Sequence, residues 1–225
     1  MRYPGGKNFV YRSLINLIPA HGTYIEPFLG SGAVIRNKQA AKRSIGIDID
    51  RAVISKAKSW PEASIELIIA DGISFLEEFS FQGNEFVYCD PPYVHSTRRS
   101  SSIYKHELTD EDHSRLIAVI QKINCKVMIS GYGNEIYESA LNNWNVISLN
   151  VPSHVGLRKE CLWLNYETPE IPFDLRFIGN NFREREQIKR RHQRLLAKID
   201  DMPAAERALL LRAVGNKYSS EISLL

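Results

Sequence analysis

The sequence predicts an α/β fold built around a mostly parallel sheet. Short apolar runs rich in Ile, Val and Phe alternate with amphipathic segments through the first three quarters of the chain, a pattern typical of strands that alternate with helices. Glycine or aspartate follows several of these runs, as at the carboxyl ends of parallel strands, where ligands bind in open α/β sheets. We expect strands at 23–28, 44–48, 65–70, 85–89, 126–130, 145–150 and 161–166.

Length and composition fit one catalytic-sized domain with an appendage. The 225 residues, 44% of them hydrophobic, can bury a core, and we expect a main domain over 1–170 and a helical appendage over 171–225. Cys89, Cys125 and Cys161 lie singly in apolar runs, which favours small buried hydrophobic residues over a disulfide or zinc site. No leader or membrane-length run is evident. We therefore expect a cytoplasmic protein with no metal and no membrane partner.

The first expected strand runs directly into a glycine-containing turn that opens a helix. The segment reads Glu26, Pro27, Phe28, Leu29, Gly30, Ser31 and Gly32. Glycines let the backbone approach a ligand closely, and the first N–H groups of a helix face outwards at such a turn. A Gly-x-Gly pair is more often only a tight turn, so it predicts a cofactor site only together with a second signal.

That second signal is the aspartate at the end of the next strand. An acid in the position of Asp48, at the tip of the second strand, can hydrogen-bond ribose hydroxyls. Asp50 is more simply the N-cap of a helix over 51–59. Asp71-Gly72, after the third strand, reads as a turn with a helix cap.

The quartet Asp90-Pro91-Pro92-Tyr93 follows the expected strand 85–89. An exocyclic amine on a planar base is a poor nucleophile because its lone pair is delocalised into the ring. Asp90 can accept one N–H hydrogen and the Pro91 carbonyl the other, while the prolines restrict the backbone and Tyr93 offers a ring for stacking. Asp and Pro are also common turn formers, so the quartet alone leaves an ordinary loop open.

Two segments after the quartet are open to both structural and functional interpretations. The polar stretch 95–105 contains Arg98 and Arg99, which can contact phosphates around an extruded base, although a plain solvent loop is an equal alternative. In the expected helix 109–124, His113 lies beside Leu116 and Ile117. A lone histidine in that setting is more often structural, and we assign it no catalytic role.

Positive charge is concentrated near the carboxyl end of the chain. Residues 182–199 contain seven Lys or Arg and two Glu, a net charge of +5, which leaves −2 for the other 207 residues. We interpret this segment as an amphipathic helix whose Lys189, Arg190, Arg191 and Arg194 contact phosphates; a solvated helix packed on the main domain is the alternative. A second short helix over 204–214 would complete a hairpin for DNA contact, packing or dimerisation.

Three motifs occur together in a specific order. They are the basic, glycine-rich start Arg2-Tyr3-Pro4-Gly5-Gly6-Lys7, the glycine turn, and the Asp90 quartet. In this combination the chain closely resembles the Dam-like family of S-adenosylmethionine-dependent DNA adenine-N6 methyltransferases, over residues 2 to about 166. The resemblance implies a Rossmann-like class I methyltransferase sheet with a C-terminal helical extension.

The resemblance also implies roles for individual residues. The catalytic residues it implies are Asp90, Pro91, Pro92 and Tyr93. The cofactor-binding residues it implies are Tyr3, Gly5, Gly6, Lys7, Glu26, Pro27, Phe28, Gly30, Ser31, Gly32, Asp48, Asp71 and Asp90, with Asp48 as the ribose acid and Asp71 near the cofactor's adenine. The stretches 109–116 and 158–164 continue the family pattern, and we interpret them as scaffold.

We therefore expect methyl transfer from S-adenosylmethionine to N6 of a flipped adenine in double-stranded DNA. Many relatives carry a large target-recognition insert, whereas 57 residues, 33–89, separate Gly32 from Asp90 here, so sequence recognition lies elsewhere. A ribosomal RNA methyltransferase, a cytosine-N4 methyltransferase and a catalytically silent nucleic-acid-binding protein are the alternatives. A nicotinamide dehydrogenase fits least, since the third glycine of that fingerprint is missing. Restriction-modification, phage protection and host regulation all fit.

Overall fold

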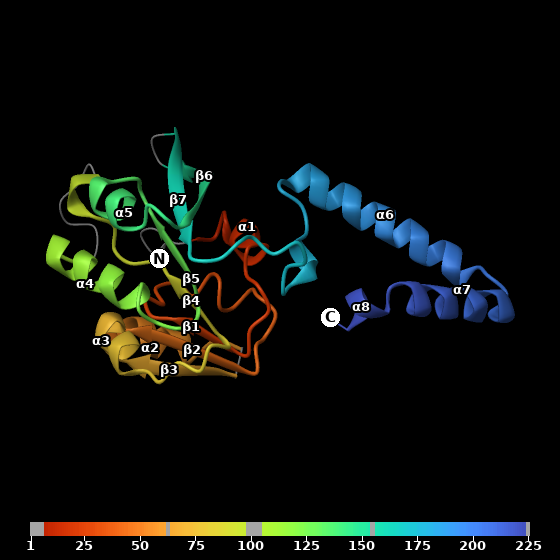
Figure 1. The fold of residues 1–225 in the computed structure, drawn as a ribbon, viewed down its shortest axis with the longest axis horizontal. Helices are drawn as coiled ribbons and strands as arrows, with labels where there is room; N and C mark the ends of the chain where they lie inside the picture. Colours follow the sequence, from red (N-terminus) through yellow and green to blue (C-terminus); the bar gives the residue numbers. More distant parts are fainter. Residues whose placement is uncertain (1–6, 62–63, 98–104, 154–155, 224–225) are drawn as a thin grey trace. The chain divides into compact units, whose positions relative to one another are not determined.

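The structure, a computed structural model, describes residues 7–61, 64–97, 105–153 and 156–223. It divides into two compact units, Met1–Asp174 and Leu175–Leu225. The first unit contains the sheet and the second contains the long helices α6 Phe182–Asp200 and α7 Ala204–Lys217 (Figure 1).

A seven-stranded sheet forms the centre of the first unit, in the order β3-β2-β1-β4-β5-β7-β6. The pairings among β3, β2, β1, β4 and β5 are parallel, and β7 is antiparallel to both β5 and β6. This arrangement confirms the predicted Rossmann-like α/β fold. The strands are β1 Thr23–Glu26, β2 Arg43–Asp48, β3 Ile65–Ile69, β4 Glu85–Cys89, β5 Lys126–Gly131, β6 Asn145–Ser153 and β7 Gly156–Leu164.

The central strands β1, β4 and β5 are apolar between their polar ends because both faces of the sheet are covered. Successive side chains point to opposite faces, and every residue of β4 is buried. Ile25, Val87 and Ile129 pack into one hydrophobic cluster with side chains of the helices on that face. Their neighbours Tyr24 and Phe86 stack on the other face, with ring centroids 5.9 Å apart.

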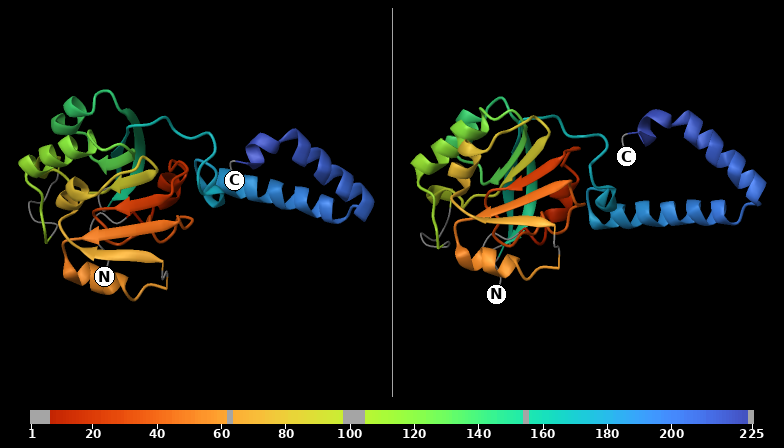
Figure 2. Two further views of the ribbon diagram at one scale, coloured as in Figure 1. Left: turned by 60° about the horizontal axis from the view of Figure 1, so that its bottom comes forward. Right: turned by 90° about the horizontal axis from the view of Figure 1, so that it is seen from below.

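Five α-helices accompany the sheet, and Figure 2 shows α3, α4 and α5 together on one of its faces. They are α1 Tyr11–Ile15, α2 Arg51–Ala57, α3 Gly72–Glu78, α4 Asp110–Ile120 and α5 Glu135–Ala140. As predicted, Asp50 caps α2, accepting a hydrogen bond from the Ala52 N–H. His113 is buried in α4 with a ring nitrogen 2.9 Å from Tyr137 Oη, which confirms its structural role.

The segment after Gly32 is not the helix that the glycine turn led us to expect. Residues 33–37 form hydrogen-bonded turns instead. The Arg36 and Lys38 N–H groups donate to carbonyls four residues earlier, but the Asn37 N–H donates to Val34 O, three residues earlier, so the bond pattern is mixed. The buried Glu26 carboxyl anchors the segment by accepting the Ile35 N–H at 3.1 Å, as first-turn N–H groups require a partner outside the helical bond series.

The β6–β7 hairpin is longer than predicted. Its pairing reaches Ser153↔Gly156, whereas the sequence suggested strands at 145–150 and 161–166. The polar residues Arg158, Lys159 and Glu160 hid the beginning of β7, because they interrupt the apolar pattern while still pairing with β6. Helix α4 is shorter than predicted and ends at Ile120.

The second unit begins with a short 3₁₀ turn, Leu175–Phe177, and continues as α6 Phe182–Asp200, α7 Ala204–Lys217 and α8 Ser219–Ile222. Helix α6 is capped by the Asn181 side chain, which accepts the Glu184 N–H. No residue of α6 or α7 is buried, and Leu195 of α6 and Leu209 of α7 remain exposed. The apolar faces of these two helices are therefore not covered within the unit.

No helix in the described part of the chain is long and apolar enough to span a membrane. Cys89 is buried, Cys125 and Cys161 are partly buried, and all three are free thiols. Among the described residues no group of three or more His, Cys, Asp or Glu side chains is arranged to hold a metal ion.

We predict that Gly72→Ala destabilises the first unit by about 1–3 kcal/mol. Gly72 begins α3, and a Cβ at this position would overlap the Pro27 carbonyl oxygen, a backbone atom that cannot rotate away. Urea denaturation followed by fluorescence measures the change. The matched control is Gly215→Ala in α7, where a Cβ meets only open space and where alanine favours the helix. Equal stability of Gly72→Ala and wild type would contradict the close approach.

Candidate active site

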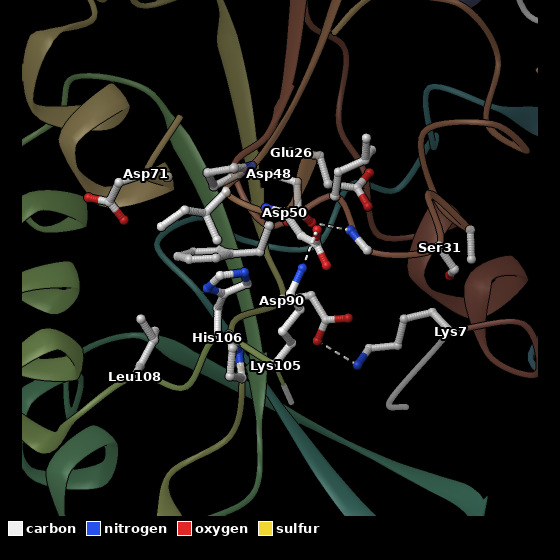
Figure 3. Close-up of a pocket in the computed structure, with 18 of the residues that line it drawn as sticks. Lys7, Glu26, Ser31, Asp48, Asp50, Asp71, Asp90, Lys105, His106 and Leu108 are labelled. Carbon is white, nitrogen blue, oxygen red and sulfur yellow. Dashed lines mark hydrogen bonds and ion pairs between the residues drawn. The ribbon is translucent and has the colours of Figure 1, made fainter. Parts of the chain in front are cut away.

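A cavity of about 310 Å³ lies at the carboxyl ends of the parallel strands. Segments that follow β1, β2, β3 and β4 contribute to its wall, as does the stretch 105–108 (Figure 3). The strand order reverses between β1 and β4, because β3 lies on one side of β1 and the chain then crosses to β4 on the other. Such a switch point is where open α/β sheets bind ligands.

The glycine turn uses its two glycines differently. Gly30 has φ 48° and lines the cavity, with its N–H donating to Asp48 Oδ2 at 2.9 Å. Gly32 has φ 61° but does not line the cavity. A Cβ on Gly32 would overlap the Trp60 ring. Gly30 therefore shapes the site directly, whereas Gly32 allows the turn and the packing of Trp60 behind it.

The Asp48 side chain is held in place by two backbone donors. Its Oδ2 accepts the Gly30 N–H and its Oδ1 the Asp50 N–H, both at 2.9 Å. Burial raises the pKa of Asp48, while these two hydrogen bonds oppose the rise. Each oxygen keeps a lone pair that can accept from a ligand hydroxyl. The geometry suits recognition of a diol such as a ribose.

Glu26, at the end of β1, lines the same cavity as a buried carboxyl group. Burial raises its pKa to about 8; the Tyr24 hydroxyl and the Ile35 N–H, which donate to Oε2 at 3.0 and 3.1 Å, limit the shift, and the nearby Asp90 increases it. At neutral pH this group is mostly protonated. It therefore contributes a polar but uncharged part of the wall.

Asp71 also lines the cavity, but its carboxylate caps α3. The Oδ2 atom accepts the N–H and the hydroxyl of Ser74 at 2.9 and 2.6 Å. The capping role suggested by Asp71-Gly72 is confirmed.

The Asp90 quartet lies beside a buried ionic cluster. Lys7 Nζ is 2.6 Å from Asp90 Oδ1, 2.9 Å from Glu160 Oε1 and 2.5 Å from Tyr93 Oη. The Tyr93 hydroxyl in turn donates to Glu160 Oε1 at 2.8 Å. Burial alone lowers the pKa of Lys7, but the Asp90 and Glu160 carboxylates raise it well above its ordinary value. Lys7 is thus a fixed ammonium ion and not a base.

One oxygen of Asp90 is engaged and the other faces away from these partners. Lys7 and the Ser130 hydroxyl both donate to Oδ1, at 2.6 and 2.9 Å, and no hydrogen bond within the described part of the chain reaches Oδ2. The side chain is 19% exposed and lines the cavity. Figure 3 shows Asp90 and Lys7 facing each other at its edge. Oδ2 is therefore available as an acceptor for a ligand.

The apolar part of the cavity wall fits a planar ring. Phe28 and Ile49 follow β1 and β2, and Leu108 is the last residue of the stretch 105–108. Lys105, also in this stretch, forms an exposed ion pair with Asp50 at 3.0 Å. A carboxylate that can accept from a diol, an apolar wall and a second carboxylate at the far edge are the features that a nucleoside with a polar tail requires.

The structure brings most of the predicted cofactor residues together. Those that line the cavity are Lys7, Glu26, Pro27, Phe28, Gly30, Ser31, Asp48, Asp71 and Asp90. Gly32 lies behind the turn, and of the quartet Pro92 lines the cavity whereas Pro91 and Tyr93 do not. Tyr3, Gly5, Gly6, Arg98 and Arg99 lie outside the described residues. Lys189, Arg190, Arg191 and Arg194 belong to α6 in the second unit and are exposed.

Sequence reasoning missed Glu160 and Ser130, which contact the quartet or its lysine. From the sequence we interpret 158–164 as scaffold. In the structure Glu160 is only 3% exposed and contacts Lys7 and Tyr93. A signal was present, because Glu160 alternates with Leu162 and Leu164 and so occupies the same buried face of a strand. A charged residue in such a position requires a partner, and that partner is Lys7.

Comparison with known protein families places most of the first unit in one family. The family model of D12 class N6 adenine-specific DNA methyltransferases matches residues 3–80 and 74–152. No curated protein sequence matches the chain.

Solved structures of similar shape share little sequence with this chain. Precorrin 8w decarboxylase from Methanobacterium thermoautotrophicum is 13% identical, with 72% of this chain and 92% of that chain covered and a TM-score of 0.47. An rRNA methylase from Streptococcus thermophilus is 11% identical, with coverage of 68% and 93% and a TM-score of 0.46. Magnesium protoporphyrin IX methyltransferase from Synechocystis PCC 6803, with bound S-adenosylmethionine, is 13% identical, with coverage of 69% and 78% and a TM-score of 0.45. These values support no statement about activity.

We predict that the stability difference between Glu26→Gln and wild type depends on pH. The folded chain keeps Glu26 protonated up to about pH 8, whereas the unfolded chain ionises it at its ordinary, lower pKa. Wild-type stability is therefore lost as pH rises through this window, by about 1.4 kcal/mol per pH unit for this group. The neutral glutamine lacks this loss.

Urea denaturation at pH 5, 6, 7 and 8 tests this expectation. The stability of Glu26→Gln relative to wild type should rise steadily from pH 5 to pH 8 and level off above. A difference that stays constant with pH would show that Glu26 is not protonated in the folded protein.

Proposed function

Because the chain belongs to the D12 class N6 adenine-specific DNA methyltransferase family, we propose that it transfers a methyl group from S-adenosylmethionine to N6 of an adenine rotated out of DNA. Membership of this family confirms the resemblance drawn from the three sequence motifs. The observation that carries the proposal is the position of Asp90, which is the first residue of the quartet and also part of the cavity wall. The amine acceptor and the cofactor cavity thus share one carboxylate.

The residues around the cavity fit the methyl donor. Asp48 would accept the ribose hydroxyls, and the apolar wall that includes Phe28, Ile49 and Leu108 would contact the adenine. When bound, S-adenosylmethionine supplies a methyl group on a positively charged sulfur, which is a good leaving group. No residue of the chain has to form a covalent intermediate.

The quartet would make the substrate amine reactive. Asp90 Oδ2 and the Pro91 carbonyl accept the two N6 hydrogens and bring the nitrogen lone pair out of conjugation with the ring. The lone pair would then take the methyl group, with the electrons of the carbon–sulfur bond left on sulfur. N6 would carry the positive charge until it lost a proton to solvent. The protein's contribution is orientation and a fixed polar environment.

Tyr93 provides the ring against which the extruded base would rest. Its hydroxyl is held by Lys7 and Glu160, and its ring meets Tyr132 edge-on at 4.6 Å. These contacts fix the orientation of the ring before a base arrives. Tyr93 is only 6% exposed, so stacking of the base on this ring would require part of its cover to move, in addition to the few kcal/mol that rotating the base out of the stack costs.

The basic helix α6 would supply DNA affinity that does not depend on sequence. Its first turns carry Arg183 and Arg185, and its middle carries Lys189, Arg190, Arg191 and Arg194. No residue of this helix is buried. Such charges bind phosphates through release of counterions, which gives an affinity that falls steeply with salt.

We predict that Asp90→Ala lowers methyl transfer to DNA by at least about 1,000-fold, with DNA affinity changed by less than about threefold. The substitution removes the amine acceptor but no phosphate contact. Tritiated S-adenosylmethionine, unmethylated genomic DNA and nucleoside mass spectrometry measure transfer and identify the methylated base. Asp110→Ala, which removes an exposed carboxylate of α4 outside the cavity, is the control and should remain active.

The same assay includes ribosomal RNA as a separate substrate. N6-methyladenine in DNA supports the proposal. Label found only in RNA, label found as N4-methylcytosine, or full activity of Asp90→Ala would each reject it in its present form.

We further predict that replacing Lys189, Arg190, Arg191 and Arg194 with Gln weakens DNA binding and its salt dependence. Each lost phosphate contact should reduce the slope of log affinity against log salt by about 0.9. Fluorescence anisotropy with a labelled duplex at several salt concentrations measures this slope. The control replaces four exposed lysines of the first unit, Lys42, Lys56, Lys58 and Lys122, and so removes the same charge. Equal slopes for the two variants would exclude a special role for α6.

A further inference from the structure

Glu160 forms a buried link between Lys7 and the catalytic quartet. Its Oε1 atom is 2.9 Å from Lys7 Nζ and accepts the Tyr93 hydroxyl at 2.8 Å. The side chain is almost fully buried in β7, where β7 pairs with β5, the strand that carries Ser130. Glu160 of β7 thereby contacts Tyr93 and Lys7, which lie 67 and 153 positions earlier in the sequence.

The charges of this cluster do not cancel. One ammonium ion, Lys7, is within 3 Å of two carboxylates, Asp90 and Glu160. With both carboxylates ionised, the buried group carries a net charge of −1 beside the edge of the cavity. Removing a charge from water in this way is costly, so an uncompensated carboxylate at this position requires a reason.

The reaction provides that reason if the proposed function holds, and this inference rests on it. We propose that Glu160 is a positioning residue for methyl transfer. It holds Lys7 and Tyr93 so that Asp90 keeps Oδ2 for the substrate amine, and its own charge gives the site one negative charge in excess. During transfer the positive charge moves from sulfur to N6. A net negative cluster next to N6 stabilises that charge, whereas a neutral cluster would not.

Glu160 also sets the protonation behaviour of Asp90. Burial raises the pKa of Asp90, and the Glu160 carboxylate raises it further, while Lys7 and the Ser130 hydroxyl lower it. Within the described part of the chain, the titratable groups that interact electrostatically with Asp90 are Lys7 from the N-terminal segment, Glu26 at the end of β1, Tyr88 and Cys89 of β4, and Glu160 of β7. Tyr93 of the quartet contacts Lys7 and Glu160. Removal of the Glu160 charge should therefore lower the pKa of Asp90.

The test compares single-turnover methyl transfer by the full-length wild-type and Glu160→Gln proteins over pH 5 to 9. Glutamine keeps the size and the acceptor oxygen but not the charge. We expect the plateau rate to fall roughly 10- to 100-fold, with the apparent affinities for unmethylated genomic DNA and S-adenosylmethionine within about threefold. We also expect the acid limb of the profile to move to lower pH.

Two variants separate this role from a loss of folding. Glu85→Gln removes another buried glutamate, at the opposite end of β4, where it accepts the Gln82 and Gly83 N–H groups. It should lower thermal stability but leave the rate and pH profile of the folded protein unchanged. Glu160→Asp keeps the charge and should hold the acid limb near its wild-type position, even where the shorter side chain slows transfer.

Several outcomes would overturn the proposal. They are a Glu160→Gln rate within twofold of wild type, an unmoved acid limb, or equal rate losses in Glu160→Gln and Glu85→Gln. If the wild-type protein methylates DNA in the same experiment but one of these outcomes occurs, the proposed function stands and only the role of Glu160 is rejected. Wild-type protein that labels no DNA rejects the function itself.

Discussion

The site depends on one buried ammonium ion, Lys7, held between two carboxylates. Lys7 comes from the N-terminal segment, Asp90 follows β4, and Glu160 lies in β7. Three distant parts of the chain are joined at this point, where Lys7 and Glu160 are almost fully buried. A buried charge without its partners would cost several kcal/mol, so the three segments can come together only in the arrangement that satisfies all of them. The geometry of Asp90 and Tyr93 is a consequence of this pairing.

The cavity next to that cluster follows from the topology of the sheet. Parallel strands bring their carboxyl ends to one edge, and the reversal of strand order between β1 and β4 separates the segments that leave them. Glu26, Asp48 and Asp90 therefore line one cavity although they come from three different strands. Their environments differ: Asp48 receives two backbone N–H groups, Glu26 is mostly protonated at neutral pH, and Asp90 pairs with Lys7. One cavity thereby offers a hydroxyl acceptor, a neutral polar wall and an amine acceptor.

The second unit has a different physical character. Its helices α6 and α7 bury no residue, and α6 carries seven of the 29 Lys and Arg residues of the protein. The first unit is closed around its core and has a shaped cavity, whereas the second presents charge and exposed leucines. This division is consistent with chemistry in one unit and attachment to a polyanion in the other.

The sequence alone determined the α/β class, the order of the strands along the chain, and ten of the twenty residues that line the cavity, because each of these is encoded locally. Apolar runs predict strands, an acid or glycine after such a run marks the ligand-binding edge, and the quartet is contiguous. Only the tertiary structure decided which distant residues complete the site. Glu160 and Ser130 occur in strands that look like scaffold, and they become part of the site because β7 and β5 place them against Lys7 and Asp90. The turns after Gly32 also depend on the tertiary structure, since the Glu26 carboxyl that accepts the Ile35 N–H belongs to the preceding strand.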